Sequence, residues 1–267
     1  MQNENPAHPL LAPINHCKNR LAENIVCYGL FLVSASSLVA ECCATRGPDW
    51  LLVDMEASPA DRHDLVQMLQ ALNGARATGM ARVARNERQL IEAALDSGAL
   101  GLMVPKVESA DEARAVVDCA YYPPKGRRGV NPVRCSGYFR LLPDYFTEAN
   151  RSIMTIVQIE SAKAVAAANE IAAIEGIDIL FIGCGDLACD LGQAGQVEGP
   201  EMERAIDRVL KACQQHGKTP GIFAYSLELA RRYAGQGFRF IAFGNDLKLM
   251  ASGLEHHMRS LDESTSS

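Results

Sequence analysis

Acidic side chains follow several short apolar segments of the chain, and they are the first candidates for chemistry. Asp54 and Glu56 follow the segment WLLV, Glu160 follows IMTIVQI, and Asp186 lies just beyond IDILFIG. Two carboxylates that converge on one site repel each other unless a positive charge lies between them. Glu160 and Asp186 are therefore candidate ligands of a divalent cation that keeps some of its water ligands. From spacing alone, the alternative is that each acid caps the helix that follows it.

Arg82 and a pair of glycines point to an anionic ligand. Arg82 lies between apolar neighbours in GMARVA. A buried arginine is costly without an anion, so we expect it to contact a bound carboxylate or enolate, or Glu56. Gly183 and Gly185 flank a turn whose N–H groups would reach a substrate carboxylate. A tight strand-to-helix turn is an equally good explanation of the two glycines.

Other reactive residues have simpler explanations. Cys184 has no histidine near it in sequence, which favours an inert thiol. His63, His256 and His257 are expected on the surface. The long segment 121–151 carries four basic residues, which form either a solvated face or a site for a second substrate carboxylate: Lys125, Arg127, Arg128 and Arg134.

The composition excludes several classes of protein. The 267 residues carry a net charge of -6, which argues against a nucleic-acid surface. No apolar run reaches the roughly 18 residues of a membrane span, and the first residues lack the pattern of a signal peptide. The nine cysteines are scattered without a CxxC pair. This predicts free thiols in a reducing cytoplasm, not a disulfide scaffold or a zinc site.

Alternating elements must position the candidate residues. The predicted strands are 27–33, 50–55, 79–84, 100–105, 153–160, 177–183, 220–224 and 238–244, and each precedes an amphipathic segment. The segment 109–120, for example, opens with Ser109 as N-cap and Glu112 three residues later, which predicts a capping box. The strands are apolar on both faces, as in a buried parallel sheet.

Eight strand–helix pairs without a break in composition predict a single-domain (β/α)₈ barrel over residues 23–261. Residues 1–22 are expected to be an N-terminal extension, and residues 262–267 a flexible tail. The alternative is a doubly wound sheet, which would need a glycine-rich turn where the sequence has LVSASS. In a barrel, the site lies at the carboxyl ends of the strands, where the polar residues above are found. A segment as long as 121–151 is usually functional or mobile.

The chain resembles the metal-dependent (class II) pyruvate aldolases of the HpcH/HpaI family, within the phosphoenolpyruvate/pyruvate barrel superfamily. The resemblance extends from about Cys27 to about Ala251 and rests on blocks in the same order. They are DWLLVDMEASP, ARVARNE, GLMVPKVESADEA, YYPPKGRRGV, VQIES, IDILFIGCGDLACDLG, GIFAYSLELARRY and FGNDLKLMA.

The resemblance implies roles for individual residues. Glu160 and Asp186 would hold Mg²⁺, Mn²⁺ or Co²⁺, and Arg82 would steady the oxygen of a 2-oxoacid. The turn from Gly183 to Gly185 and the Asp186 backbone would bind the carboxylate of pyruvate, and Phe31 would line the pocket. The implied reaction passes through an enolate, stabilised by the metal and Arg82, that attacks an aldehyde or ketone or is released by C–C cleavage. A homo-oligomer, a hexamer in relatives, is also implied.

Three departures from the family pattern affect the predicted function. The family has Asp-x-Glu-His after the second strand, and its histidine assists proton transfer; here Asp54 and Glu56 remain, but Ala57 replaces the histidine. The family's Gly-Pro turn is Gly183-Cys184. The segment VNPVRCSGYF also differs from the family's glycine- and alanine-rich one, in a loop that the resemblance links to choice of the partner substrate.

Three functions remain open at this stage. The first is a carbon–carbon lyase that cleaves or forms a bond next to an enolisable 2-oxoacid, with Arg82, Asp54 and Glu56 in catalysis. The second is decarboxylation of oxaloacetate or condensation of its enolate, as in citrate formation, which needs the missing histidine less. The third is a catalytically weakened protein that binds oxoacids. The retained metal ligands and Arg82 favour an enzyme.

Overall fold

The strands form a closed parallel barrel. The computed structural model describes residues 14–142 and 144–265. Its strands are β1 (Cys27–Leu32), β2 (Trp50–Asp54), β3 (Thr78–Arg82), β4 (Gly101–Val104), β5 (Met154–Ile159), β6 (Ile179–Ile182), β7 (Thr219–Phe223) and β8 (Phe240–Asn245). They pair in chain order, and β8 closes on β1. The predicted (β/α)₈ barrel is confirmed, and the doubly wound alternative is wrong.

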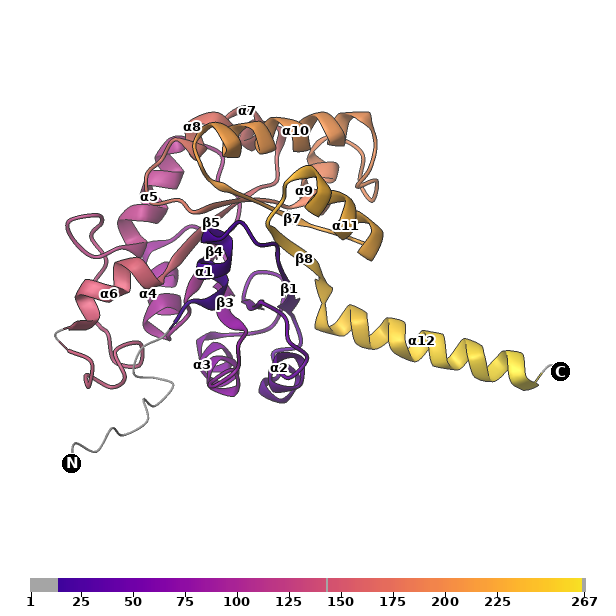
Figure 1. Cartoon of the computed structure of the whole chain (residues 1–267), viewed down its shortest axis with the longest axis horizontal. Coiled ribbons are helices and arrows are strands. Elements are labelled where there is room, and N and C mark those ends of the chain that lie inside the picture. The colour runs from indigo at the N-terminus through magenta and orange to yellow at the C-terminus, as the bar shows by residue number, and fades with distance from the viewer. Residues whose placement is uncertain (1–13, 143, 266–267) are drawn as a thin grey trace.

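Helices surround the barrel (Figure 1). They are α1 (His16–Ala22), α2 (Ser37–Ala44), α3 (Arg62–Ala71), α4 (Arg88–Asp96), α5 (Ala110–Ala120), α6 (Asp144–Ser152), α7 (Ala162–Ala166), α8 (Ala168–Ala172), α9 (Cys184–Asp190), α10 (Pro200–Gln215), α11 (Leu227–Gln236) and α12 (Asp246–Thr265). The predicted N-cap of α5 is confirmed, because Ser109 Oγ accepts the Glu112 N–H at 3.2 Å. The reciprocal half of the predicted capping box is not formed, because the Glu112 carboxylate accepts from the N–H of Glu108 and not from that of Ser109.

Side chains that point into the barrel fill it with aromatic and methionine residues. Phe31, Trp50, Phe181 and Phe240 belong to this inner cluster, and the rings of Trp50 and Phe240 stack with centroids 4.2 Å apart. Gly29 leaves room for the indole, since a Cβ at this position would lie 2.2 Å from a ring carbon of Trp50. The larger cluster of buried side chains lies between the strands and the helices. The packed interior gives the site a rigid floor.

The short helix α1 closes the amino-terminal end of the barrel. Cys17 is fully buried in the inner cluster, and its N–H donates to Thr78 Oγ1 at 3.0 Å. The Asn15 side chain donates to the carbonyls of Leu100 and Ser152, each at 2.9 Å. The predicted extension 1–22 is therefore wrong for residues 14–22, which are part of the barrel. Residues 1–13 lie outside the described part of the chain.

The segment 121–151 lies at the amino-terminal end of the barrel, because it joins the end of α5 to the start of β5. Together with α1 it borders a cavity of about 880 Å³ that is also lined by Arg128 and Arg134. Arg128 is buried and lies 2.6 Å from Asp96 Oδ1. The basic residues therefore cannot bind a substrate carboxylate at the mouth of their own barrel. The resemblance also implied that this loop helps to choose the partner substrate. Within a single chain that expectation is wrong, because the loop lies at the opposite end of the barrel from the mouth.

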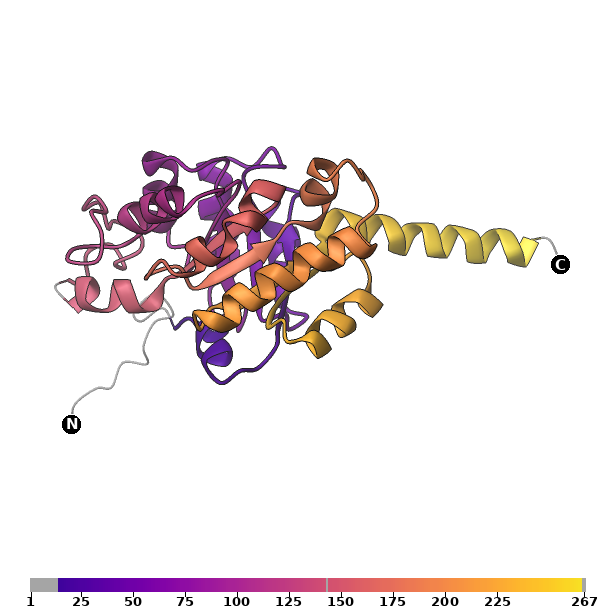
Figure 2. The same ribbon diagram turned by 90° about the horizontal axis from the view of Figure 1, so that it is seen from above.

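The last helix, α12, projects from the barrel as a separate arm, as both views show (Figures 1 and 2). It contains 20 residues, or about 30 Å of helix. The predicted tail began at residue 262, whereas the helix continues to Thr265; residues 266–267 are outside the described region. His256 and His257 are exposed on the arm, as predicted.

None of the helices in residues 14–142 and 144–265 combines the length and the apolar character that membrane crossing requires. All nine cysteines are free thiols, as the sequence predicted. Burial raises the pKa of Cys184 to about 12, so its thiol stays protonated and supports the inert interpretation.

Candidate active site

The carboxyl ends of five strands bring the predicted site residues to one mouth. Asp54 ends β2 and Arg82 ends β3; Glu160 directly follows β5, and Asp186 lies in the first turn of α9, after β6. Phe31 belongs to β1 and is 4% exposed at the floor of this mouth. The structure therefore gathers all of the predicted site residues at one end of the barrel.

Arg82 is the centre of the charge network. Its Nε and Nη2 donate to the two carboxylate oxygens of Asp54 at 2.9 and 2.5 Å, a bidentate pair. Its Nη1 lies 2.9 Å from Glu56 Oε2 and donates to Gln158 Oε1 at 3.3 Å. The guanidinium carbon lies 5.0 Å from the centre of the Phe31 ring. Burial lowers the pKa of Arg82, but hydrogen bonding and charge from Asp54 and Glu56 raise it above its ordinary value, so it stays a cation.

This network explains how a largely buried arginine is tolerated. Glu56 was an expected partner of Arg82, whereas the bidentate partner Asp54 was not predicted. A guanidinium has five N–H groups, and the contacts above engage four of them. One N–H of Nη2 thus stays without a partner among the described residues. It is available to an oxygen atom of a bound ligand.

Asp54 fixes the turn that carries Ala57. It is 1% exposed, and its Oδ1 also accepts the N–H groups of Glu56 at 3.0 Å and Ala57 at 3.2 Å. The hydroxyl of Ser58 donates to the Asp54 carbonyl. The turn is therefore well ordered although Ala57, which is exposed, brings no titratable group to it.

Glu160 is buried and held from two sides. Its Oε1 accepts the Lys106 N–H at 2.8 Å, and its Oε2 accepts from Gln158 Nε2 at 3.0 Å. Burial raises the pKa of Glu160 to about 7, and the charges of Asp186 and Glu56 add to this rise. The Lys106 N–H and the charge of Arg82 oppose it. A buried carboxylate of this kind is stabilised by a cation.

Asp186 and the glycine turn lie beside Glu160. A Cβ on Gly183 would be 2.8 Å from Glu160 Oε2, and a Cβ on Gly185 would be 2.5 Å from Tyr225 Oη. Larger residues would therefore displace the groups that surround the turn. The charge of Asp186 raises the pKa of both Glu160 and Glu56, which places its carboxylate in the same mouth.

Neither acid caps the following helix with its side chain, although Asp186 lies in the first turn of α9, where a negative charge is favourable. Ser161 Oγ caps α7 by accepting the Ala164 N–H at 3.1 Å. The helix α9 begins at Cys184, and its N-cap residue, Gly183, has no side chain that could cap it. Within the described residues, the Asp186 carboxylate forms no hydrogen bond or ion pair. It is exposed and available for another ligand.

The donors at this mouth fit a divalent cation. Four carboxylates face two cations there, Arg82 and Lys106, so two negative charges are uncompensated when every acid is ionised. Oxygen ligands are those that Mg²⁺ and Mn²⁺ prefer. Glu160 and Asp186 are the carboxylates that Arg82 does not bind directly, which leaves them for the metal.

A second acidic group has a structural explanation. Asp61, His63 and Asp64 offer atoms within 4.8 Å of one another at the start of α3. Asp61 accepts the N–H of His63 and of Asp64, and the Asp64 carboxylate accepts the Asp61 N–H, which completes a capping box. His63 is exposed, as predicted. These residues start a helix, and no catalytic role is assigned to them.

Three residues of the mouth were not assigned a role from the sequence. Gln158 links Arg82 to Glu160, and its polar side chain inside an otherwise apolar strand was the available signal. Lys106 contributes a backbone N–H, which no side-chain pattern reveals. Tyr225 covers Gly185 from the loop after β7, a contact that only the closed barrel creates.

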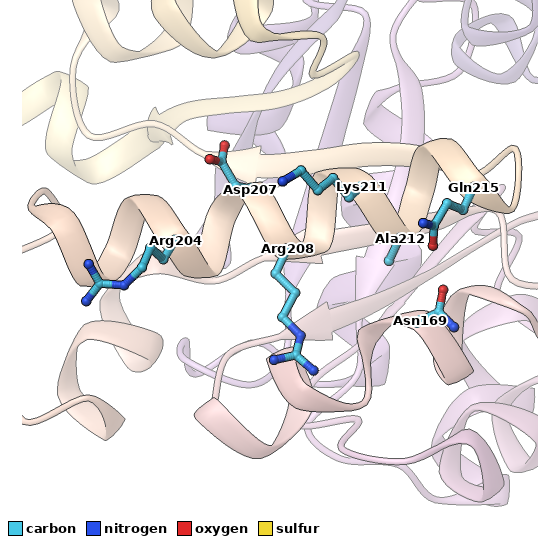
Figure 3. A pocket seen from close by; sticks show the side chains of 7 residues that line it. All are labelled: Asn169, Arg204, Asp207, Arg208, Lys211, Ala212 and Gln215. Carbon is cyan, nitrogen blue, oxygen red and sulfur yellow. The ribbon is translucent and has the colours of Figure 1, made fainter.

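A surface groove of about 360 Å³ lies away from this mouth, between α10 and α8 (Figure 3). Arg208 and Lys211 of α10 line it, and Arg208 Nη2 donates to the Ala166 carbonyl at 3.1 Å. The groove is open, and Asp207 is the one acid among its lining residues. The candidate active site is the mouth at the carboxyl end of the barrel.

A closed barrel with an arginine and several carboxylates at its mouth defines an enzyme of the aldolase and lyase type. Residues 27–253 match the model of the HpcH/HpaI aldolase/citrate lyase family, and the chain belongs to this family. The predicted resemblance is confirmed, and with it the enzyme class, a carbon–carbon lyase.

Curated relatives and solved structures agree with this assignment. The chain is 38% identical over 241 residues to the 5-keto-4-deoxy-D-glucarate aldolase of Klebsiella pneumoniae, covering 90% of this chain and 94% of the relative. It is 41% identical over 243 residues to the hydroxypyruvate/pyruvate aldolase of Paraburkholderia phytofirmans, covering 88% and 93%. A family protein from Burkholderia cenocepacia superposes with a TM-score of 0.89 at 36% identity, covering 93% and 99%. The citrate synthase SbnG superposes with a TM-score of 0.86 at 26% identity, covering 94% and 98%.

Proposed function

We propose that this chain is a metal-dependent carbon–carbon lyase that acts on 2-oxoacids through an enolate. The observation that carries the proposal is the convergence of Arg82, whose side chain is 11% exposed, with Glu160 and Asp186 at one mouth. Relatives named as 5-keto-4-deoxy-D-glucarate aldolase and hydroxypyruvate/pyruvate aldolase support the 2-oxoacid class.

Each residue has a role that follows from its contacts. Glu160 and Asp186 hold the divalent cation, for which Mg²⁺ or Mn²⁺ is the first choice and Co²⁺ the next. When bound, the cation supplies positive charge where the enolate oxygen develops. The remaining N–H of Arg82 donates to the same oxygen. The turn of Gly183, Gly185 and the Asp186 backbone binds the carboxylate of the oxoacid, and Phe31 forms the apolar floor.

Oxaloacetate decarboxylation, or condensation of the enolate with a ketone, is the second candidate. Ala57 favours it, because loss of carbon dioxide yields an enolate without removal of a hydroxyl proton. The similarity to a citrate synthase fits a condensation. Asp54 and Glu56 act in either reaction by holding Arg82 in place.

Metal depletion and replacement of the ligands test the proposal. Glu160→Ala and Asp186→Ala should each abolish metal-dependent turnover of oxaloacetate and of a 4-hydroxy-2-oxoacid. His63→Ala is the matched control, because it removes one member of the other acidic group and leaves metal activation unchanged. Aldehyde release identifies an aldolase, and pyruvate with carbon dioxide identifies a decarboxylase. Full turnover after exhaustive chelation would contradict both metal-dependent functions. Binding of an oxoacid without turnover would indicate a protein that binds oxoacids and does not catalyse their conversion.

We also infer that the protein is a homo-oligomer. Apolar side chains at Leu247, Met250, Leu254 and Met258 recur three or four residues apart on α12 and are 41–65% exposed. A helix of this kind is stable in water when its apolar face is covered. A second copy of the chain supplies such a cover, and a hexamer is the expected assembly by family resemblance.

A further inference from the structure

The hydroxyl of Tyr225 reaches the glycine turn of the active-site mouth. Tyr225 lies two residues after the end of β7, and a Cβ on Gly185 would be 2.5 Å from its Oη and 3.8 Å from its Cζ. The contact with the turn is therefore made by the hydroxyl group and not by the ring. Tyr225 is 42% exposed, so a small molecule in the mouth can reach it.

The backbone of Gly185 does not by itself require a glycine. Gly185 is the second residue of α9, and its φ lies outside the left-handed region that favours glycine. Inside a helix, glycine is less favourable than alanine. The missing Cβ therefore serves the space beside the backbone. The Tyr225 hydroxyl occupies that space.

The Tyr225 ring is held in place, whereas its hydroxyl is uncommitted. The ring centroid lies 5.0 Å from that of Phe223, and Lys248 Nζ lies 5.6 Å from the Tyr225 centroid. Within residues 14–142 and 144–265, the hydroxyl forms no hydrogen bond. A tyrosine hydroxyl is protonated at neutral pH and donates one hydrogen bond. This donor is available to a molecule bound at the turn.

We propose that the Tyr225 hydroxyl donates a hydrogen bond to the carboxylate of the bound 2-oxoacid. The inference rests on the proposed function, in which the turn around Gly185 binds that carboxylate. Glu160 flanks the same turn from another side, since its Oε2 would be 2.8 Å from a Cβ on Gly183. An incoming carboxylate meets negative charge there, and a hydrogen bond to a charged group is among the stronger ones. Tyr225 is thus a substrate-binding residue.

Replacement of Tyr225 by phenylalanine removes the hydroxyl and keeps the ring. Tyr225→Phe should raise KM for oxaloacetate in metal-dependent decarboxylation by about tenfold, as expected for loss of a hydrogen bond to a charged group. The value of kcat should change little, because the bond forms equally in the ground state and the transition state. Calorimetric titration of the Mn²⁺-loaded protein with oxalate, which carries carboxylates but is not turned over, should show the same loss of affinity.

Tyr28→Phe is the matched control. Tyr28 lies near the amino-terminal end of β1, at the opposite end of the barrel from the mouth. Its loss of a hydroxyl should change neither KM nor the affinity for oxalate. Unchanged values of both in Tyr225→Phe would overturn the proposal. Weaker binding of Mn²⁺ alone by Tyr225→Phe would also overturn it, because the hydroxyl would then serve the metal and not the carboxylate.

Gly185→Ala tests the same contact from the other side. The added Cβ displaces the hydroxyl, so KM for oxaloacetate should rise in the parent. In Tyr225→Phe the nearest ring atom leaves ordinary van der Waals contact, and Gly185→Ala should add much less to KM. Equal increases in both backgrounds would show that the two groups act independently. That result would overturn the link between Gly185 and the hydroxyl on which the proposal rests.

A measurement of enolate formation separates this inference from the function on which it rests. Metal-dependent exchange of the methyl protons of pyruvate for deuterium reports the enolate alone. Exchange by the parent, together with unchanged KM and oxalate affinity in Tyr225→Phe, refutes only the assignment of Tyr225. Absence of exchange, together with absence of oxaloacetate turnover, refutes the enolate function itself.

Discussion

Arg82 depends on the planar shape of its side chain as much as on its charge. One edge of the guanidinium pairs with both oxygens of Asp54, while Nη1 reaches Glu56 and Gln158. Lysine keeps the charge but cannot form this fork. We expect Arg82→Lys to lose about 3 kcal/mol of transition-state stabilisation, or roughly 10² in rate. Single-turnover decarboxylation of oxaloacetate by metal-saturated enzyme measures the loss.

Arg85→Lys serves as the control for this substitution. Arg85 is 69% exposed on its side chain and pairs with Glu87 at the surface. Its replacement should leave the rate unchanged. A wild-type rate in Arg82→Lys would show that Arg82 does not contact the reacting atoms.

Ala57 separates two reactions that share an enolate. General acid–base catalysis is worth about 10² to 10⁴-fold, and only aldol chemistry needs it at the hydroxyl. Ala57→His should therefore raise aldol cleavage more than oxaloacetate decarboxylation. The ratio of the two rates in one preparation, parent against variant, is the measurement. If the parent already cleaves a 4-hydroxy-2-oxoacid rapidly and histidine slows it, the space at Ala57 belongs to the acceptor.

At the scale of residues, the sequence predicted those side chains whose polarity contrasts with an apolar strand. Asp54, Arg82 and Glu160 stand out in this way, and all lie at the mouth. The pairing of Arg82 with Asp54 depends on the register between β2 and β3, which puts the two residues side by side. Lys106 acts through its backbone N–H and a positive φ, and neither leaves a trace in residue type.

At the scale of elements, Asp246 joins the start of α12 to the end of β1. It is 5% exposed, and its carboxylate accepts the Val33 N–H at 2.9 Å and both the N–H and the hydroxyl of Ser34. Asp246→Ala leaves these donors without their partner. The three donors are only partly buried, so water replaces some of the lost hydrogen bonding, and we expect a loss of roughly 2–4 kcal/mol in the free energy of unfolding.

Urea denaturation of Asp246→Ala and Asp246→Asn measures this contribution. Asparagine keeps one acceptor oxygen and should lose about half as much as alanine. Equal stability of the parent and Asp246→Ala would mean that water replaces the carboxylate.

Strands were easier to predict than the ends of the chain. Every strand boundary lies within two residues of its predicted position, because buried parallel strands are apolar on both faces and end abruptly. The helix α1 was missed, since a helix of seven residues with one buried side chain has no periodic pattern. Its position comes from contacts of Asn15 and Cys17 with distant strands.

At the scale of the whole molecule, the barrel was predicted from the number and order of its elements, but the arm was not. The segment that forms α12 has the same amphipathic pattern as helices that pack on the barrel. The amphipathic pattern of a sequence predicts which face of a helix is apolar, but it does not predict which surface will cover that face.

Charge introduced on the apolar face of the arm tests the assembly. The double substitution Met250→Glu and Leu254→Glu should reduce the molar mass measured by light scattering to that of one chain, 28.9 kDa. Ser252→Glu adds a charge to the same helix away from these two residues and should leave the assembly intact. A parent protein that already scatters as a single chain would contradict the homo-oligomer.

The projecting arm also ties folding to concentration. If its apolar face is covered only in the assembly, part of the free energy of folding comes from association. For two chains that associate through one contact, each tenfold dilution lowers the free energy that association contributes to folding by about 1.4 kcal/mol. The midpoint of thermal unfolding would then rise with protein concentration, and a value measured at one dilution would not describe the protein at another. The free energy of unfolding would then depend on the protein concentration as well as on the sequence.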